Sequence, residues 1–179
     1  MKKQEHTTSL SGGTFVEKSN TRIEFRGKLD SLDALIVFIE SMTEGERAED
    51  FVGKLEEVRS KVHDILSCEV TGRACEPVSL WGLSADEIQE RSHNPEKYLG
   101  LGHIMTDKTM GLAAASLNLL RTKIREAELS ACRAFKDEPL GQERHDIIRA
   151  LNRLSSAMYV LIYSFLPEGY DKTVTFGKS

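Results

Sequence analysis

The residues best suited to chemistry lie on one side of a long helical stretch, 110–135. Arg121, Arg125 and Glu128 recur there at steps of four and three, beside an apolar seam with the same helical period. Arg125 and Glu128 can pair locally as an i, i+3 ion pair, whereas the residue four positions after Arg121 is another arginine. Either this face is solvated, or an anionic ligand or a partner subunit lies against it.

A second polar group lies near the N-terminus. Thr8 and Ser9 precede a Ser-Gly-Gly sequence at 11–13, and Lys18 follows it. Backbone N–H groups beside glycines, hydroxyls and a lysine suit a polyphosphate. The G-x-x-x-x-G-K-[ST] loop is missing from this stretch, so a flexible N-terminus is the more ordinary interpretation of the pattern alone.

Charged and amide side chains elsewhere leave two interpretations open. Arg22, Glu24 and Asp30 form a charged group that exposed ion pairs would also explain. Asn152 lies next to the apolar seam of a C-terminal helical stretch, where asparagine is unfavourable unless its amide makes a specific hydrogen bond. For Asn152 a structural and a functional role remain equally open.

The composition is typical of one globular domain. The chain has 179 residues, of which 40% are hydrophobic and 29% charged. Its net charge of -4 argues against nucleic acid as the main partner. The N-terminus has no signal-peptide core, and the longest uncharged run, 154–167, is too short to cross a bilayer. We therefore expect a cytoplasmic protein with no membrane partner.

The cysteines form no recognisable motif. Cys68, Cys75 and Cys132 are odd in number and irregularly spaced, so a disulfide framework is not expected. With His93 and His103 they give no zinc-type spacing. We expect packed, structural cysteines and no metal ligand.

Four amphipathic segments must position these residues. Apolar residues recur at helical spacing over 28–41, 46–67, 110–135 and 144–165, and a shorter helix is expected at 84–92. Thr43 with Glu46, and Ser84 with Glu87, have the spacing of capping boxes. The pattern predicts an all-α, antiparallel up-and-down bundle of about five helices over 28–167. Residues 1–27 form an arm that is extended over 15–27, a loop-rich insertion covers 68–108, and 168–179 form a tail.

Four stretches of the chain, taken together, resemble the corrinoid (cobalamin) adenosyltransferases, most closely the ethanolamine-utilisation type. The matching stretches are LSGGTFVEKSNTRIEFRGKLDSLDAL (10–35), RSHNPEKYLGLGHIM (91–105), LNLLRTKIREAELSACRAF (117–135) and DIIRALNRLSSAMYVLI (146–162). The resemblance implies a helical bundle that transfers the 5′-deoxyadenosyl group of ATP to the cobalt of a reduced cobalamin and releases triphosphate.

The resemblance also assigns roles to residues. Those implied to bind ATP, with 1–27 as a nucleotide-binding arm, are Thr8, Ser9, Lys18, Arg22, Glu24, Arg125, Glu128 and Asn152. The implied catalytic residues are Asp30, Arg121 and Arg125, and the first two match a pair that bridges subunits near the corrinoid. His103, Ile104 and Met105 align with a segment that places an apolar wedge beneath the corrin ring.

The implied ligands and partners are ATP, Mg²⁺ and cobalamin as substrate. The resemblance further implies a homo-oligomer with the site between subunits, with a trimer favoured over a dimer. A flavoprotein reductase and a bacterial microcompartment are the implied biological context, which is ethanolamine utilisation.

The chain also departs from the family pattern. No T-G-D-x-G loop precedes Ser9, and Glu126 and Ser156 replace an arginine and an aspartate of relatives. Ethanolamine-type enzymes also carry an N-terminal extension with a histidine and clustered cysteines that bind a divalent metal, and this sequence starts after that point. The alternatives are therefore a non-catalytic corrinoid- or nucleotide-binding bundle that delivers or senses the cofactor, and a purely structural helical protein.

Overall fold

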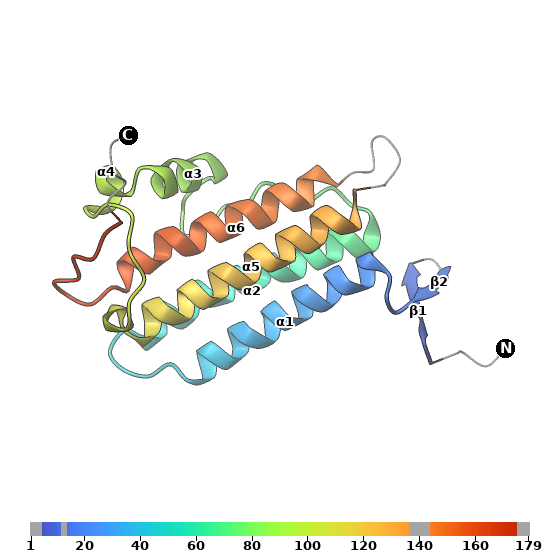
Figure 1. Ribbon diagram of the computed structural model, residues 1–179, viewed down its shortest axis with the longest axis horizontal. Helices are drawn as coiled ribbons and strands as arrows, with labels where there is room; N and C mark the ends of the chain where they lie inside the picture. Colours follow the sequence, from blue (N-terminus) through green and yellow to red (C-terminus); the bar gives the residue numbers. More distant parts are fainter. Residues whose placement is uncertain (1–4, 12–13, 137–143, 175–179) are drawn as a thin grey trace.

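Four long helices form the body of the molecule in the computed structural model, which describes residues 5–11, 14–136 and 144–174. They are α1 (Thr21–Ser41), α2 (Ala48–Thr71), α5 (Leu112–Ala134) and α6 (His145–Ser164). Neighbouring helices run antiparallel, because the segment between α2 and α5 carries the chain back along the bundle (Figure 1). The predicted all-α bundle is confirmed.

The core consists of the apolar seams that the sequence spacing indicates. Their fully buried members include Leu29, Leu32, Ile36, Leu55, Ile65, Leu117, Leu120, Ile124, Leu151, Leu154 and Met158. Two aromatic pairs pack edge to face near opposite ends, Phe25 with Phe135 at 5.7 Å and Phe51 with Phe165 at 4.8 Å between ring centroids. Burying each large side chain contributes roughly 1.5–3 kcal/mol, so the seams supply most of the stabilisation.

The N-terminal segment differs from the prediction. A short hairpin, β1 (Thr7–Ser11) and β2 (Thr14–Glu17), precedes α1, and α1 begins at Thr21 rather than near residue 28. The extended segment predicted over 15–27 is therefore wrong beyond β2. The side chain of Asn20 caps the helix by accepting a hydrogen bond from the backbone N–H of Arg22 at 2.9 Å. Phe25 then anchors the first turns in the core, which the alternating pattern of this segment did not indicate.

The two predicted capping boxes have opposite outcomes. Ser84 and Glu87 form the expected reciprocal box at the start of α3 (Ala85–His93). Thr43 does not cap α2, because its hydroxyl donates to the carbonyl of Ile39 at 2.7 Å and α2 starts after Arg47 without a side-chain cap. A threonine at the end of a helix can satisfy the carbonyl of the preceding turn instead of starting the next helix.

The segment between α2 and α5 is ordered along one side of the bundle. It contains α3, α4 (Pro95–Leu99) and the 3₁₀ turn η1 (Lys108–Met110), and α3 packs on α6. Its last part is tied to the C-terminal segment, because Met105 N–H donates to the Lys172 carbonyl at 3.0 Å and Val174 N–H donates to the His103 carbonyl at 2.7 Å. Over the three described ranges, no helix is long and apolar enough to cross a membrane.

A buried carboxylate joins the start of α1 to the end of α2. Glu69 is 1% exposed and accepts hydrogen bonds from Arg22, at 2.8 Å from Nε, and from Arg26. Two guanidinium groups compensate the desolvation of this charge, so the contact fixes where α1 begins relative to α2.

Replacing Glu69 with glutamine should destabilise the protein strongly. The change leaves two partly buried arginines without their carboxylate, and we expect a loss of about 3 kcal/mol in the free energy of unfolding. Urea unfolding followed by circular dichroism measures it. Glu56→Gln, on the exposed face of α2, is the control, and equal stability of the two variants would contradict the assignment.

A second ion pair between α1 and α2 predicts pH-dependent stability. Arg59 donates to Asp33 at 2.6 Å and lowers the pKa of that carboxyl, as does His63, while partial burial opposes them. A carboxyl with a lowered pKa in the folded state stabilises above its unfolded pKa, and this contribution is lost as the pH falls through the folded value.

Asp33→Asn should therefore be less stable than the parent at neutral pH, by up to about 1 kcal/mol. The difference should shrink as the pH falls below the ordinary range of carboxyl titration. Thermal unfolding of both proteins across this range measures the effect, and a difference that is constant with pH would contradict it.

Candidate active site

The packing of α5 against α6 brings three of the expected residues together. Asn152 on α6 donates from Nδ2 to Oε1 of Glu128 on α5 at 3.0 Å, and Arg153 donates to Oδ1 of Asn152 at 3.2 Å. Arg125 lies one turn before Glu128, is exposed, and makes no ion pair or hydrogen bond to any side chain that the structure describes. The result is a polar patch with a cation available for an anionic ligand.

Arg121 continues this patch along α5 in a different environment. It is half-buried, donates from Nε to Asn118 at 3.1 Å, and lies over the ring of Tyr159 at 5.8 Å. Burial lowers its pKa, and the charge of Arg125 adds to that effect. No carboxylate within the described ranges lies at ion-pair distance from Arg121, so the guanidinium has no counter-ion among those residues.

Tyr159 also connects Arg121 to the predicted corrinoid side. Its hydroxyl is 3.1 Å from Nδ1 of His103 and 2.9 Å from the hydroxyl of Tyr163. Tyr163 in turn donates to the Gly102 carbonyl at 2.9 Å and accepts from Ile104 N–H at 3.3 Å. Burial raises the pKa of Tyr163, so the phenol stays protonated and able to donate.

The two tyrosines were not among the residues picked from the sequence. Their i, i+4 spacing places both phenols on one face of α6, and this is the only sequence signal that pointed to them. Together they hold the segment of His103, Ile104 and Met105. Ile104 is buried, whereas Met105 is 47% exposed and His103 borders a cavity of about 550 Å³. A wedge from this segment would therefore come from His103 or Met105 rather than from Ile104.

The hairpin holds the expected phosphate-binding residues apart from the α5–α6 patch. Thr8 and Ser9 are consecutive residues of β1, paired with Val16 and Phe15, so their side chains point to opposite faces of the ribbon. Lys18 follows β2 and is exposed, with its backbone N–H donating to the His6 carbonyl at 2.9 Å. The predicted Ser-Gly-Gly cradle falls partly outside the described residues, at 12–13.

The charged residues of α1 separate into three different environments. Arg22 is held by the buried Glu69, which is a structural contact at one end of the bundle. Glu24 pairs with Arg133 of α5 at 3.0 Å on the surface. Asp30 is exposed, and its carboxylate makes no ion pair or hydrogen bond within the described part of the chain.

Within one chain, the structure therefore assembles only part of the predicted set. Arg121, Arg125, Glu128 and Asn152 form one polar surface, to which Tyr159 joins His103. Among the described residues, no hydrogen bond or ion pair joins Thr8, Ser9, Lys18 or Asp30 to that surface. The patch can bind an anion through guanidinium groups and an adenine or ribose through its amide and carboxylate, but it has no nucleophile of its own.

Comparison with known proteins agrees with this arrangement. The cobalamin adenosyltransferase family matches residues 1–164. The chain is 38% identical to corrinoid adenosyltransferase EutT of Salmonella typhimurium over 162 residues, which are 90% of this chain and 59% of that protein. It is also 38% identical to EutT of Escherichia coli K12 over 161 residues. The chain thus spans about three fifths of the length of these curated relatives.

Solved structures show the same fold at lower identity. A variant of the PduO-type ATP:corrinoid adenosyltransferase from Lactobacillus reuteri, complexed with cobalamin and ATP, has a TM-score of 0.67 at 18% identity. That match covers 95% of this chain and 96% of the other. A second variant, complexed with ATP, has a TM-score of 0.65 at 18% identity over 89% of this chain and 88% of the other. With its sequence match over residues 1–164, the chain belongs to the cobalamin adenosyltransferase family.

Proposed function

We propose that this protein is an ATP:corrinoid adenosyltransferase of the ethanolamine-utilisation type. The observation that carries the proposal is the surface on which Arg125 stands exposed beside the Glu128–Asn152 hydrogen bond. A solvated helix face would not need an asparagine positioned by a neighbouring glutamate, and Arg125 is a cation left available to a phosphate. Membership of the family supports the same activity.

The proposed reaction uses the corrinoid itself as the nucleophile. The electron pair of cobalt(I) attacks the 5′ carbon of ATP, and a cobalt–carbon bond forms as the carbon–oxygen bond to the α-phosphate breaks. Triphosphate leaves with the electron pair of that bond. The protein then needs no general base, and its task is to align the two substrates and stabilise the charge on the leaving group.

Each part of the patch has a role in this proposal. Arg125 binds the triphosphate and takes up its increasing charge, while Glu128 and Asn152 orient the nucleoside. Lys18, Thr8 and Ser9 add phosphate contacts from the hairpin. Because Thr8 and Ser9 face opposite sides of β1, only one of their hydroxyls reaches a given phosphate, and the other serves the hairpin.

ATP binding by Arg22 and Glu24 has less support, because Arg22 pairs with Glu69 and Glu24 pairs with Arg133. Arg22 already donates to Glu69, and we propose that it serves ATP binding indirectly, by holding the N-terminal arm in place.

Mg²⁺ is the proposed counter-ion of the triphosphate, and it would neutralise phosphate charge when bound. The Glu128 carboxylate is a hard oxygen donor of the kind that Mg²⁺ accepts, so the patch fits this ion.

The proposed corrinoid side is the segment held by Tyr159 and Tyr163. His103 and Met105 would contact the corrin ring, where an apolar, water-poor surface favours removal of the lower cobalt ligand. The hydrogen bonds of the two tyrosines keep this segment beside α6 and Arg121. A flavoprotein reductase is the proposed source of the electron, and the cytoplasm, within a microcompartment, is the proposed location.

We propose that the active site is completed by a second copy of the chain, in a trimer. Asp30 and Arg121 carry opposite charges, and neither has an ion-pair partner in its own described chain. Near the start of α5, Phe38, Met42 and Leu112 are 57%, 49% and 68% exposed around a groove of about 310 Å³. Exposed apolar side chains gathered in this way are typical of a subunit interface.

Arg125→Ala tests the proposed reaction. Mixing the protein with ATP, Mg²⁺ and chemically reduced cobalamin should yield adenosylcobalamin. The change in the absorption spectrum of cob(I)alamin measures the rate of this reaction. The variant should lose about 10²- to 10³-fold in kcat/KM, because a donor to the leaving group is removed. Arg149→Ala, an exposed arginine of α6 outside the patch, should keep full turnover. ATP binding without any adenosylcobalamin would instead favour the non-catalytic binding protein.

Mixing two inactive variants tests the shared site. Asp30→Ala and Arg121→Ala should each be impaired in the corrinoid step. In mixed oligomers, about one quarter of the interfaces would pair an intact Asp30 with an intact Arg121 from the neighbouring chain, so activity should reappear. If the two residues act within one chain, mixing restores nothing, and size-exclusion chromatography with light scattering reports the oligomer in the same samples.

A further inference from the structure

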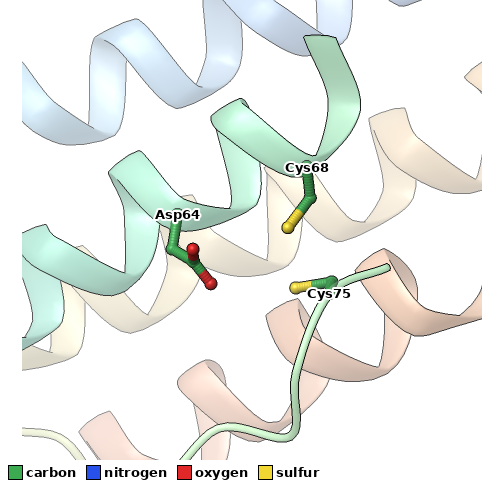
Figure 2. A group of neighbouring side chains, drawn as sticks. All are labelled: Asp64, Cys68 and Cys75. Atoms are coloured by element: carbon green, nitrogen blue, oxygen red, sulfur yellow. The ribbon is translucent and has the colours of Figure 1, made fainter. Parts of the chain in front are cut away.

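Three metal-ligating side chains converge where α2 ends, beside the start of α6. Figure 2 shows Asp64 and Cys68 on α2 and Cys75 on the following loop, with both sulfur atoms and the carboxylate directed toward one another. One ligand atom from each residue lies within 4.8 Å of the other two. Asp64 and Cys68 are one turn apart on the same helix, and Gly72 at φ 73° turns the chain so that Cys75 returns to them.

The charges around this cluster are balanced without any bound ion. Arg73 pairs with Asp64 at 2.6 Å, and Arg144 pairs with Asp146 at 3.0 Å. Asp146 also accepts the backbone N–H of Cys75 at 2.8 Å, which holds the loop beside the start of α6. The two carboxylates are thus matched by two guanidinium groups, and these pairs bring no net charge to the thiols. A divalent cation that displaces both thiol protons would keep this balance unchanged.

The thiols are sheltered as well as close. Cys68 is 0% exposed, and Cys75 is partly buried against the core. Burial and the neighbouring Cys68 raise the pKa of Cys75 to about 12 in the absence of a cation. Two sulfur atoms and a carboxylate that meet in such a sheltered position form an arrangement that metal ions bind.

We propose that Cys68, Cys75 and Asp64 form a binding site for a thiophilic divalent cation, of which Zn²⁺ is the type. On binding, each thiol loses its proton to solvent, two metal–sulfur bonds form, and a carboxylate oxygen of Asp64 supplies the third ligand. Asp64 keeps 35% of its side chain exposed, so a water molecule can reach the fourth position. This site departs from the expectation, based on sequence spacing, that the cysteines are only structural.

Sulfur ligands decide the class of cation. Thiolates select zinc and its softer neighbours over Mg²⁺ or Ca²⁺, which prefer oxygen ligands. The three ligand atoms of the cluster lie within 4.8 Å of one another. In a tetrahedral zinc site the two sulfur atoms lie closer together than 4.8 Å, because each metal–sulfur bond is about 2.3 Å long. Cys75 belongs to the loop after Gly72, so a small movement of that loop can close the site around the ion.

The site would stabilise the end of the bundle from which the hairpin leaves. Cys68 is followed directly by Glu69, which holds Arg22 and Arg26 of α1. The backbone carbonyl of Cys68 accepts a hydrogen bond at 2.9 Å from Arg144, the residue just before α6. A cation that ties Cys68 to Cys75 would therefore brace α1, α2 and α6 together, and it should raise the unfolding temperature.

Cobalt titration tests the proposal without relying on adenosyltransferase activity. The full-length, tag-free protein is reduced, stripped with chelator and titrated with Co²⁺ alone. We expect one Co²⁺ per chain, with a near-ultraviolet thiolate-to-cobalt charge-transfer band that Zn²⁺ abolishes. Zn²⁺ binding should release about two protons, measured in weakly buffered solution. No charge-transfer band would overturn the proposal.

Variants assign the signal to the cluster. Cys75→Ser should weaken Co²⁺ binding by on the order of 100-fold or more, and Asp64→Asn by about 10-fold. Cys132→Ser is the matched control, since Cys132 is exposed on α5, and should leave the titration unchanged. Cys75 is preferred over the fully buried Cys68 because its replacement is less disruptive to folding, which circular dichroism verifies.

The competing possibility is a Cys68–Cys75 disulfide. Peptide mapping by mass spectrometry of oxidised and reduced samples detects it. Reduced protein that takes up no Co²⁺ but readily forms this disulfide would overturn the metal site in favour of a redox pair. A band that survives in Cys75→Ser would overturn it as well, because the cobalt would then lie elsewhere.

Discussion

The close packing of α5 on α6 is the constraint on which the polar surface depends. Alanines are fully or almost fully buried along both helices, including Ala127 and Ala131 on α5 and Ala150 and Ala157 on α6. Such small side chains let two helix backbones approach closely over several turns. The amide of Asn152 then reaches Glu128 directly, and this hydrogen bond could not form if the helices were further apart.

Arginines in two parts of the bundle differ in their partners. Where α1 begins and α2 ends, arginines pair with carboxylates, as with Glu69 and Asp146. On the α5 surface, Arg121 and Arg125 have no such carboxylate among the described residues. A cation left unpaired beside an apolar core costs stability unless a ligand or a neighbouring subunit later supplies the counter-charge. The distribution therefore distinguishes arginines that pair within the chain from Arg121 and Arg125, for which we propose a binding role.

The segment between α2 and α5 links these regions to the proposed corrinoid side. Its first part carries Cys75 back to α2, and its last part is held to α6 by the phenols of Tyr159 and Tyr163. A segment with no helical period would have little order by itself. Here hydrogen bonds to α6 hold both parts of the segment, from Cys75 to Asp146 and from His103 to Tyr159. His103 therefore has a defined position beside the ring of Tyr159, over which Arg121 lies.

The sequence by itself determined the bundle, its four seams and the stripe of Arg121, Arg125 and Glu128, because helical periodicity is a local property of the chain. The sequence did not indicate the early start of α1, because Phe25 belongs to a segment with an alternating pattern. Its role as a core anchor depends on the contact with Phe135, which only the tertiary structure shows. The resemblance assigns Arg22 to ATP, which stays a prediction, and it did not indicate that Arg22 donates to Glu69, 47 positions along the chain. Only the tertiary structure joined Asn152 to Glu128, Tyr159 to His103, and Cys68 to Cys75. Each of these contacts depends on how helices and loops pack against one another, and the spacing of residues along the chain does not predict that packing.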